Sequence, residues 1–576
     1  MQKQENIINS RIYFLYTVLS IAFIIAALRV TYLQTYKHQE LKEKADKQQR
    51  RPMSLAKKRG TITDRNNSIL AIDTDSISVY SYAPEYDFKN YTINKISKEL
   101  SSVIDIDKEE LRKKISNPGF TWIKRQMDVK YKQALDKIDI PGINYVYESK
   151  RVYPKKNLAA SLLGFTGIDN TGLAGIEISF DSVLIDKNNE EKIFLDGMGR
   201  EVIGKNKTQV TTKKVKTNTI KLSLDEKIQH VSERELKKGV IEYKAKKGLA
   251  AVMDLETGDL LSFATYPTYD PNNPTGNWNV INNWGVSEIY EPGSTMKIFS
   301  IAAALEKKKI TLNELVPCPA AMMVGGWEVH DHGADGTRHL TPLDIIKVSS
   351  NTGTSIVTRR IPPKEHRDLL EKFGFGKTTD SNLTGEIGGI LPDLPWDQVR
   401  QSTISFGQGV SVTPIQILTA MSAIARGGVK IEPRIIKEIV DIDGNTIKEY
   451  KSKEVRTLSK DVADKMRNLM VAVVEDKEGT GRATKIPGYV IAGKTGTADK
   501  VENGRYSGNV MSSFLGFYPA EKPKILQFVL LDSPQTAHFA SMTAVPIYKR
   551  IASDTIKILK IPPTKPEELI EKKNKP

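Results

Sequence analysis

The chain begins with a long apolar stretch. No residue from Ile12 to Leu28 carries a charge, and the apolar character resumes after Arg29 as far as Leu33. With Arg29 near the interface, this stretch can span a bilayer as a tilted helix. Tyrosines stand near its two ends, where an aromatic belt belongs: Tyr13, Tyr16, Tyr32 and Tyr36.

A cleaved signal peptide is the alternative interpretation of this stretch, but no small-x-small cleavage site follows the run. We therefore predict a transmembrane signal anchor at residues 12–33, preceded by a short cytoplasmic tail at residues 1–11. The polar residues 34–58, rich in Lys, Gln, Glu and Arg, are expected to form a stalk.

Short alternating and helical patterns fill residues 59–220. The strand patterns are Arg59–Asn67, Ile69–Ile72 and Ile77–Tyr80, the helical patterns are Ile93–Ile104, Lys108–Ile115 and Tyr131–Ile138, and strands and turns return from Tyr145 to Leu184. None of these segments brings a nucleophile, a base and an orienting group together. We expect a non-catalytic, mixed α/β pedestal domain here, bounded by the Lys/Thr-rich connector Lys205–Asn218.

Longer apolar patterns occupy residues 221–561. The predicted elements are a helix over Leu224–Tyr243 capped by Ser223 or Asp225, a hairpin of Leu249–Met253 with Leu260–Thr265, an apolar helix after Ser294, a long second helical region holding Ser349–Asn351, strands through Ile491 and Ile525–Leu531, and a final amphipathic helix over Val545–Leu559. Strands from both ends of this region indicate one mixed sheet covered by helices, an α+β fold. The Pro/Lys/Glu-rich tail at residues 562–576 is expected to be disordered.

Composition narrows the possible functions only slightly. A net charge of +16 suits anionic neighbours such as lipid head groups or an acidic wall polymer, although solvated Lys-rich faces explain it equally well. No basic-aromatic motif for nucleic acid is present, so we expect no nucleic-acid partner. The single cysteine, Cys318, excludes an intramolecular disulfide.

The candidate chemistry centres on Ser294, which follows the turn signal Pro292-Gly293 and opens an apolar helix. Unpaired N–H groups and the helix dipole favour developing negative charge there. Lys297, three residues on, lies on the same helical face, and a desolvated neutral lysine can take the proton of a serine hydroxyl. The alternative is an ordinary helix N-cap. Spacing alone is weak support, because Ser54 and Lys57 share it in a basic stretch without an apolar helix behind them.

Two further motifs follow in order. Ser349-Ser350-Asn351 forms an S-x-N, and Lys494-Thr495-Gly496-Thr497 forms a K-T-G-T. Each is common by chance, and Ser507-Gly508-Asn509 also matches S-x-N. Only the set is specific: these three motifs together are the serine set of penicillin-binding proteins and β-lactamases.

On these residues the chain resembles the class B penicillin-binding proteins, monofunctional peptidoglycan D,D-transpeptidases, and most closely their division-specific septal type. The resemblance covers nearly the whole chain. Its other motifs are Arg59–Asn66, Leu162–Gly167, Gly175–Glu177, Tyr269–Asn272, Gly407–Gly409 and Thr413–Gln416. One departure is Asn67, where the family usually has Gly; Asn tolerates the left-handed backbone almost as well. The implied catalytic fold is the penicilloyl serine transferase fold, shared with β-lactamases.

The resemblance implies a mechanism. Ser294 attacks the penultimate D-Ala carbonyl of a stem pentapeptide, with Lys297 accepting its proton. Ser349 relays a proton to the departing D-Ala, and Asn351 holds Lys297 and the substrate amide. Lys494 keeps Lys297 neutral and attracts the terminal carboxylate.

The K-T-G-T motif supplies the remaining implied contacts. The hydroxyls of Thr495 and Thr497 bind the terminal carboxylate, and Gly496 lets the strand approach the substrate backbone. The N–H groups of Ser294 and Thr497 form the oxyanion hole. An amine from a neighbouring stem then releases the acyl-enzyme, giving a 4-3 cross-link, and no metal or organic cofactor is needed.

The implied partners are lipid II-derived peptidoglycan strands, β-lactams as covalent inhibitors, a membrane-embedded glycosyltransferase and other divisome proteins. The implied location is the cytoplasmic membrane, single-pass, with the catalytic domain on the extracytoplasmic side. The alternatives are an elongation-class transpeptidase, a serine β-lactamase, and a penicillin-sensing receptor or divisome scaffold.

A histidine cluster offers one other possibility. His330, His332 and His339, with Asp331 and the upstream Cys318, are candidate zinc ligands between the first two motifs. Their spacing fits no standard zinc pattern. We therefore favour a polar loop bordering the cleft over a metal site.

Overall fold

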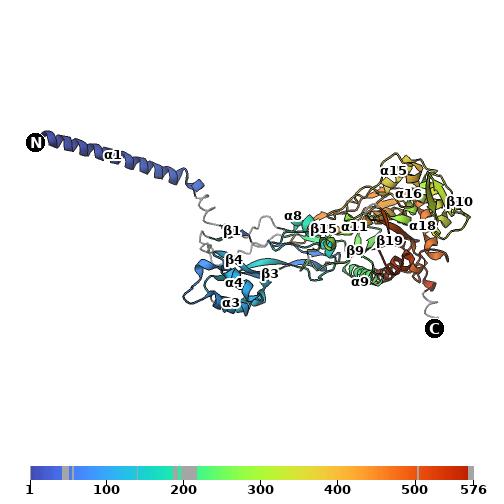
Figure 1. The fold of residues 1–576 in the computed structure, drawn as a ribbon, viewed down its shortest axis with the longest axis horizontal. Helices are drawn as coiled ribbons and strands as arrows, with labels where there is room; N and C mark the ends of the chain where they lie inside the picture. The colour runs from blue at the N-terminus through green and yellow to red at the C-terminus, as the bar shows by residue number, and fades with distance from the viewer. Residues whose placement is uncertain are drawn as a thin grey trace. The chain divides into compact units, whose positions relative to one another are not determined.

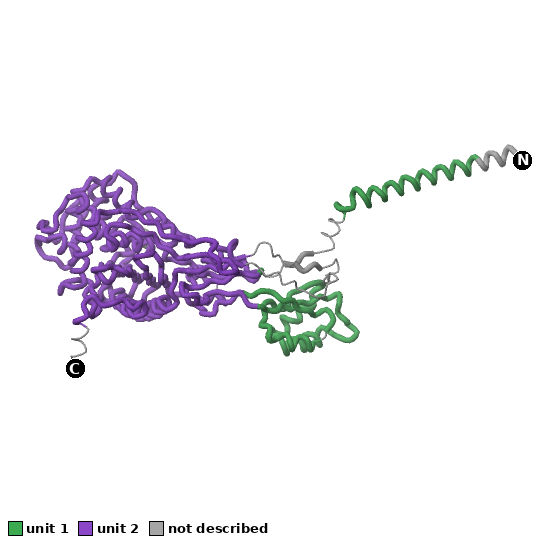
Figure 2. The backbone as a smooth tube through the Cα atoms, turned by 180° about the vertical axis from the view of Figure 1, so that it is seen from behind, with its two compact units in different colours: residues 1–57, 75–150, 187–215 green, residues 58–74, 151–186, 216–576 purple. Residues whose placement is uncertain are grey.

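The computed structural model describes residues 2–41, 51–54, 57–138, 140–185, 192–195, 217–274, 276–502 and 505–568. Its contacts divide the chain into two compact units, distinguished by colour in Figure 2. Unit 1 contains residues 1–57, 75–150 and 187–215; unit 2 contains residues 58–74, 151–186 and 216–576. Most of the predicted connector at residues 205–218, and part of the predicted stalk, lie outside the described residues.

Helix α1, Gln2–Thr35, is drawn in Figure 1 as one uninterrupted helix. Its segment Ser10–Thr35 is the one described helix long and apolar enough to cross a membrane, with a mean hydropathy of 2.0. The apolar side chains from Ile12 to Tyr32 are exposed, which is what a lipid-facing helix requires. The helix therefore fits a single-pass membrane anchor.

The remainder of unit 1 packs two amphipathic helices against strands. Its described elements are β1 (Arg51–Ser54), β6 (Lys192–Leu195), α3 (Ile93–Ser101), α4 (Lys108–Ile115), β4 (Phe120–Asp128), α5 (Lys132–Leu135) and most of β3 (Ile69–Tyr82) and β5 (Ile143–Val152). Asp107 caps α4 by accepting hydrogen bonds from two backbone N–H groups, so the helix begins where the sequence predicts. The apolar faces of α3 and α4 form a small core with Ile77 and Val79.

Two predictions for this region are wrong in detail. The separate strands predicted at Ile69–Ile72 and Ile77–Tyr80 form one strand, β3, because antiparallel pairing with β2 at one end and β4 at the other carries it through the polar residues between. The helix predicted over Tyr131–Ile138 is reduced to the single turn α5. Short helices need tertiary packing to extend, and only Leu135 of α5 is buried.

A seven-stranded sheet contributes several strands to unit 2, and two of its strands, β3 and β5, carry members of a buried charge network. In this sheet β2 (Ile62–Thr63) pairs with β3 and, in parallel, with β7 (Thr219–Leu222), followed by β15 (Ile436–Val440) and β16 (Thr446–Glu449). The Arg59 guanidinium donates to Glu177 at 3.0 Å, and Arg151 donates to the other Glu177 oxygen at 2.7 Å and to Asp73 at 3.1 Å. Burial of these ions is tolerated because each has an opposite charge and hydrogen bonds.

The main sheet of unit 2 has five antiparallel strands in the order β18-β19-β20-β8-β9, so β18 lies at an edge. Its strands are β8 (Lys247–Asp254), β9 (Leu260–Tyr266), β18 (Ala492–Glu502), β19 (Arg505–Tyr518) and β20 (Ile525–Asp532). Alternate residues of β8 enter two cores: Leu249 and Ala251 join a core with α12 and α17, whereas Ala250 and Val252 join one with α9 and α19. Helices therefore cover both faces, which explains the continuous apolar runs in the sequence.

Three predicted helices of unit 2 are confirmed, as α9, α12 and α19, whereas the structure adds helices for which no position was predicted. The longer ones are α9 (Glu226–Glu242), α12 (Met296–Glu306), α14 (Asn351–Thr358), α15 (Pro363–Phe373), α16 (Gln398–Ser405), α17 (Pro414–Ala425), α18 (Lys460–Glu475) and α19 (Ala544–Ile558). Short helices are α6 (Ala160–Leu163), α7 (Gly175–Ser179), α8 (Asp181–Leu184), α10 (Trp278–Ile281), α11 (Trp284–Ser287) and α13 (Pro342–Lys347). Four small hairpin strands, β10 (Val316–Pro319), β11 (Ala321–Val324), β12 (Trp327–His330) and β13 (Thr337–Leu340), precede α13, and β14 (Val429–Ile431) pairs with β17 (Glu454–Arg456).

The predicted disordered tail makes ordered contacts as far as it is described. The N–H groups of Thr564 and Lys565 donate to the Gly488 carbonyl at 2.9 and 3.0 Å. The Gly488 N–H in turn donates to a Glu568 carboxylate oxygen at 3.0 Å. The composition-based expectation of disorder therefore does not hold for residues 564–568, because a specific turn elsewhere in unit 2 receives them.

Candidate active site

Ser294 lies in a 3-10 turn, Gly293–Thr295, that leads directly into α12. Gly293 has a φ of 54°, and a side chain there would collide with Ala498 of β18. A side chain on Gly407 would likewise collide with the backbone of Gly293. Glycine at these two positions allows the turn carrying Ser294 to lie against both neighbours.

Ser294 lines a cleft of about 420 Å³ together with Ser349, Asn351, Thr495 and Thr497. The fold therefore brings residues of all three sequence motifs to one cleft of unit 2. No hydrogen bond joins the Ser294 hydroxyl to any described residue, which leaves it free to meet a substrate.

Two buried lysines converge on Ser349. Lys297, 1% exposed, donates from Nζ to the Ser349 carbonyl at 2.5 Å and to its Oγ at 3.1 Å. Lys494, fully buried, donates from Nζ to the same Oγ at 3.0 Å and to the Thr495 carbonyl at 3.2 Å. One hydroxyl therefore lies between two amines contributed by α12 and β18.

Burial changes the protonation of both amines. The pKa of Lys297 is lowered well below its ordinary value, first by burial and then by the charge of Lys494, with the carboxylate of Asp331 opposing the shift. Burial also lowers the pKa of Lys494 to about 7. Because two ammonium groups cannot share one desolvated site cheaply, Lys297 is the neutral member near neutral pH.

Ser349 does not lie inside a helix, contrary to the predicted long helical region. Helix α13 ends at Lys347 and α14 begins at Asn351, and Ser349 between them has a φ of 62°. The left-handed backbone turns both its carbonyl and its hydroxyl toward Lys297. A non-glycine residue in this conformation is uncommon, and strained backbone of this kind clusters at active sites.

Asn351 makes a different contact from the one the resemblance implies. Its Nδ2 donates to the His330 carbonyl at 2.9 Å, and no hydrogen bond joins it to Lys297. The implied role in holding Lys297 is therefore taken by Ser349, whose two oxygens already accept the amine.

Asp331 is a positioning residue that the sequence reasoning did not identify. Its buried carboxylate accepts from the Ser350 hydroxyl and the Asn351 N–H, both at 2.6 Å, from the Thr352 N–H at 3.0 Å, and from Arg338 at 2.7 Å. It therefore caps the N-terminus of α14 and fixes the S-x-N motif from the β12–β13 loop. Because Asp331 stands between His330 and His332, the sequence indicated only a possible metal ligand.

The histidine cluster does not assemble as a metal site in the described residues. Rings of His330 and His332 lie 5.4 Å apart, but no group of three His, Cys, Asp or Glu side chains within the described ranges could hold an ion. Cys318 is buried at the β10 strand, where its thiol donates to the Val316 carbonyl.

The K-T-G-T motif lies on the edge strand β18. The Thr495 hydroxyl is hydrogen-bonded to that of Thr480 at 2.8 Å, and the Thr497 hydroxyl accepts from the Ala540 N–H at 3.3 Å. The loops holding Thr480 and Ala540 thus orient both hydroxyls, and neither loop carried a sequence signal.

Gly496 also permits a close approach within the protein itself, while its predicted approach to the substrate backbone stays a prediction. A side chain on it would meet the Ser513 hydroxyl at 2.5 Å and the Thr295 methyl group at 2.9 Å. The glycine therefore allows β18 to lie against β19 and the turn that carries Ser294.

Comparison with known proteins agrees with this fold. The penicillin-binding protein transpeptidase domain matches residues 248–553, and the penicillin-binding protein dimerisation domain matches residues 54–222. The probable peptidoglycan D,D-transpeptidase PenA of Neisseria gonorrhoeae is 35% identical over 97% of this chain and 94% of its own length. The peptidoglycan D,D-transpeptidase FtsI of Escherichia coli K12 is 29% identical over 95% of this chain and 91% of its own length.

Solved structures give the same result. The crystal structure of penicillin-binding protein 3 from Mycobacterium tuberculosis superimposes with a TM-score of 0.68 at 26% identity, covering 89% of this chain and 98% of that one. A peptidoglycan synthetase from Bifidobacterium adolescentis gives a TM-score of 0.69 at 26% identity, covering 89% and 98%. The fold is that of a penicillin-binding transpeptidase preceded by a dimerisation-type pedestal. The chain belongs to the class B penicillin-binding proteins and is a peptidoglycan D,D-transpeptidase.

The lowered lysine pKa values predict a distinctive pH dependence of acylation. The pKa of Lys297 is lowered well below its ordinary value, whereas Lys494 loses its proton as pH rises through about 7. Acylation by a donor with a terminal carboxylate should therefore slow above pH 7, by up to about tenfold per pH unit. Stopped-flow acylation between pH 6 and 9 measures this. A thioester donor without that carboxylate is the control, and an equal alkaline decline for both donors would contradict the assignment.

Removal of the Asp331 carboxylate should disorder the S-x-N motif. We expect Asp331→Ala to slow acylation about 10- to 100-fold, since hydrogen bonds to a charged group contribute about 1.5–3 kcal/mol each. The acylation rate constant per folded molecule is the measurement.

Asp225→Ala is the matched control, because Asp225 caps α9 outside the cleft in the same way. It should reduce stability without slowing acylation of the folded fraction. An Asp331→Ala rate equal to that of the wild type would show that Asp331 is only a structural cap.

Proposed function

We propose that Ser294 is the nucleophile of a serine acyl transfer that cross-links peptidoglycan stems. The observation that carries this proposal is the convergence of two buried lysine amines on the Ser349 hydroxyl, in the cleft that Ser294 lines. A neutral amine one helical turn from a serine hydroxyl can accept its proton, and the second amine keeps the first neutral.

In the first step Ser294 Oγ attacks the carbonyl of the penultimate D-Ala while Lys297 Nζ takes the hydroxyl proton. The oxyanion is received by the N–H groups of Ser294 and Thr497. Ser349 then passes a proton from the lysine pair to the nitrogen of the departing D-Ala, which the contacts of its Oγ with both amines permit. The C–N bond breaks and an ester to Ser294 remains.

The terminal carboxylate is bound by the hydroxyls of Thr495 and Thr497 and attracted by Lys494. Hydrogen bonds orient both hydroxyls: that of Thr495 bonds to the Thr480 hydroxyl, and that of Thr497 accepts from the Ala540 N–H. The backbone amide of the donor lies near Asn351 and β18. Residues 59–220 are assigned as the non-catalytic pedestal and residues 221–561 as the transpeptidase domain.

In the second step an amine from a neighbouring stem attacks the ester, and the lysine pair accepts its proton through Ser349. The alcohol of Ser294 is restored and a 4-3 cross-link results. A β-lactam mimics the donor and leaves a stable acyl group on Ser294. Structures of the similar Mycobacterium tuberculosis penicillin-binding protein 3 in complex with aztreonam and with ampicillin support this part of the proposal.

We further propose that the enzyme acts at the division septum, anchored by α1 with its catalytic domain on the extracytoplasmic side, where stem peptides are found. Its partners there are a membrane-embedded glycosyltransferase and other divisome proteins. The similarity to FtsI and the septal-type motifs support this assignment. In the structure Asn272, from one of these motifs, exchanges hydrogen bonds with the backbone of Tyr153, and so fixes the Arg151–Pro154 segment to the catalytic part of unit 2.

Replacement of the Ser294 hydroxyl should abolish acylation, since the ester bond cannot form. We expect no covalent labelling of Ser294→Ala by a fluorescent penicillin on a membrane gel, with the fold retained. Ser300→Ala is the matched control: Ser300 lies in α12, the helix that follows the Ser294 turn, and its hydroxyl is buried without a hydrogen-bond partner among the described residues. Its variant should label normally. Undiminished labelling of Ser294→Ala would refute the assignment.

Depletion of the protein in growing cells tests the septal role separately. A septal cross-linking enzyme should leave filaments without septa, because elongation continues while constriction stops. Swollen spheres would instead assign the enzyme to elongation. Complementation with the wild-type chain, but not with Ser294→Ala, ties the phenotype to catalysis.

A further inference from the structure

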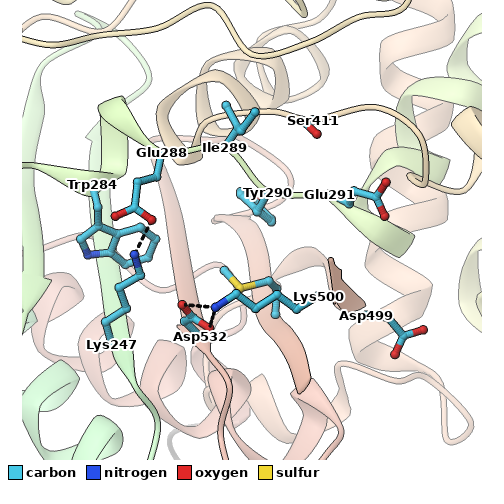
Figure 3. A pocket seen from close by; sticks show the side chains of 11 residues that line it. Lys247, Trp284, Glu288, Ile289, Tyr290, Glu291, Ser411, Asp499, Lys500 and Asp532 are labelled. Carbon is cyan, nitrogen blue, oxygen red and sulfur yellow. Dashed lines mark hydrogen bonds and ion pairs between the residues drawn. The ribbon is translucent and has the colours of Figure 1, made fainter. Parts of the chain in front are cut away.

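A second cavity, of about 290 Å³, lies beside the active-site cleft, and Asp499 lines both. It is shown in Figure 3. Apolar surface comes from Trp284, Tyr290 and Met511. The cavity is wholly within unit 2 and is not used by the acyl-transfer steps described above.

The charges around this cavity are unbalanced. Two lysines face four carboxylates. Lys247 pairs with Glu288 and lies 4.6 Å from the ring centre of Trp284, while Lys500 pairs with Asp532 at 2.9 and 3.0 Å. Both cations are therefore neutralised, and two carboxylates remain.

These two carboxylates are those of Glu291 and Asp499, which Figure 3 shows on the side of the cavity away from the two ion pairs. Glu291 accepts from the Gly409 N–H at 2.7 Å and from the Tyr506 hydroxyl at 3.3 Å. Burial raises its pKa, and the negative charge of Asp499 adds to the shift. Asp499 is exposed, and its carboxylate has no hydrogen bond or ion pair with any described residue, although its backbone pairs with Val510 in the β18–β19 ladder. A cation would relieve the repulsion between the two groups.

The direction in which a donor stem binds decides which of its residues lies near Asp499. A peptide can add as a strand to the free edge of β18. With the terminal carboxylate at Thr495 and the reacting carbonyl at Thr497, the chain runs antiparallel to β18. The residue preceding the acylated D-Ala is one residue, about 3.4 Å, further along this strand, so it lies opposite Ala498. A long side chain there can extend to the neighbouring Asp499.

The proposed reaction fixes the chemistry of that residue. In a 4-3 cross-link the acceptor amine belongs to the residue preceding D-Ala of its own stem. A donor stem of the same composition carries the same amine at the same place, unreacted and protonated at neutral pH. We propose that Asp499, supported by Glu291, is a specificity-determining residue that binds this side-chain ammonium of the donor stem. This inference rests on the proposed function.

The test uses two donor thioesters ending in D-Ala-D-thiolactate, one preceded by Lys and the other by Nε-acetyl-Lys. Thiol release by the full-length protein in detergent measures acylation. Because acylation precedes entry of the acceptor, any effect belongs to the donor. We expect the ammonium donor to react about fivefold faster with the wild type, the scale of a partly screened ion pair.

Asp499→Asn should equalise the two rates, and added salt should reduce the wild-type preference. Glu521→Gln is the matched control, because it also removes one exposed carboxylate. Glu521 lies in the β19–β20 turn, near the start of β18 and away from Asp499, so this variant should retain the preference for the ammonium donor.

Equal rates for the two donors in the wild type, or an undiminished preference in Asp499→Asn, would overturn the inference. So would loss of the preference in Glu521→Gln, since that would indicate a general charge effect. Failure of every donor and of penicillin to acylate the wild type would instead overturn the role of Ser294, and this inference with it.

Discussion

The site depends on the placement of two lysine amines around one serine hydroxyl in a buried position. Burial disfavours each ammonium, and proximity disfavours having both. The result is a pair that shares protons, with Lys297 on the side of the neutral base and Lys494 close to its own titration point. Neither lysine alone, at an exposed position, would have this property.

Close backbone packing makes this placement possible. Helix α12 is buried almost throughout, which fixes Lys297, and β18 lies against the Ser294 turn because Gly293 and Gly496 have no side chains. The third participant, Ser349, comes from a link between two helices whose second member is held by Asp331. The catalytic cleft is therefore an assembly of three elements rather than the product of any one motif.

Much of this arrangement followed from local sequence signals. The turn and apolar run around Ser294 predicted a helix start, and alternating apolar residues predicted the β8–β9 hairpin, both confirmed by the structure. Of the two cap candidates for α9, Ser223 and Asp225, the structure uses Asp225. The order of the three motifs also indicated the family. These features depend on residues close in sequence, so that helix capping, turn conformation and apolar periodicity determine them.

The sequence by itself determined the apolar N-terminal helix, the α+β class, the family and the three motifs around Ser294, Ser349 and Lys494. Tertiary structure alone decided the left-handed backbone at Ser349 and the hydrogen bond from the Asn351 side-chain amide to the His330 carbonyl. It also decided which groups Asp331, Thr480 and Gly496 contact. It also joined two predicted strands into β3. The reason is physical: these features arise from contacts between segments far apart in the chain, and local propensity contains no information about which distant backbone or side chain will lie opposite.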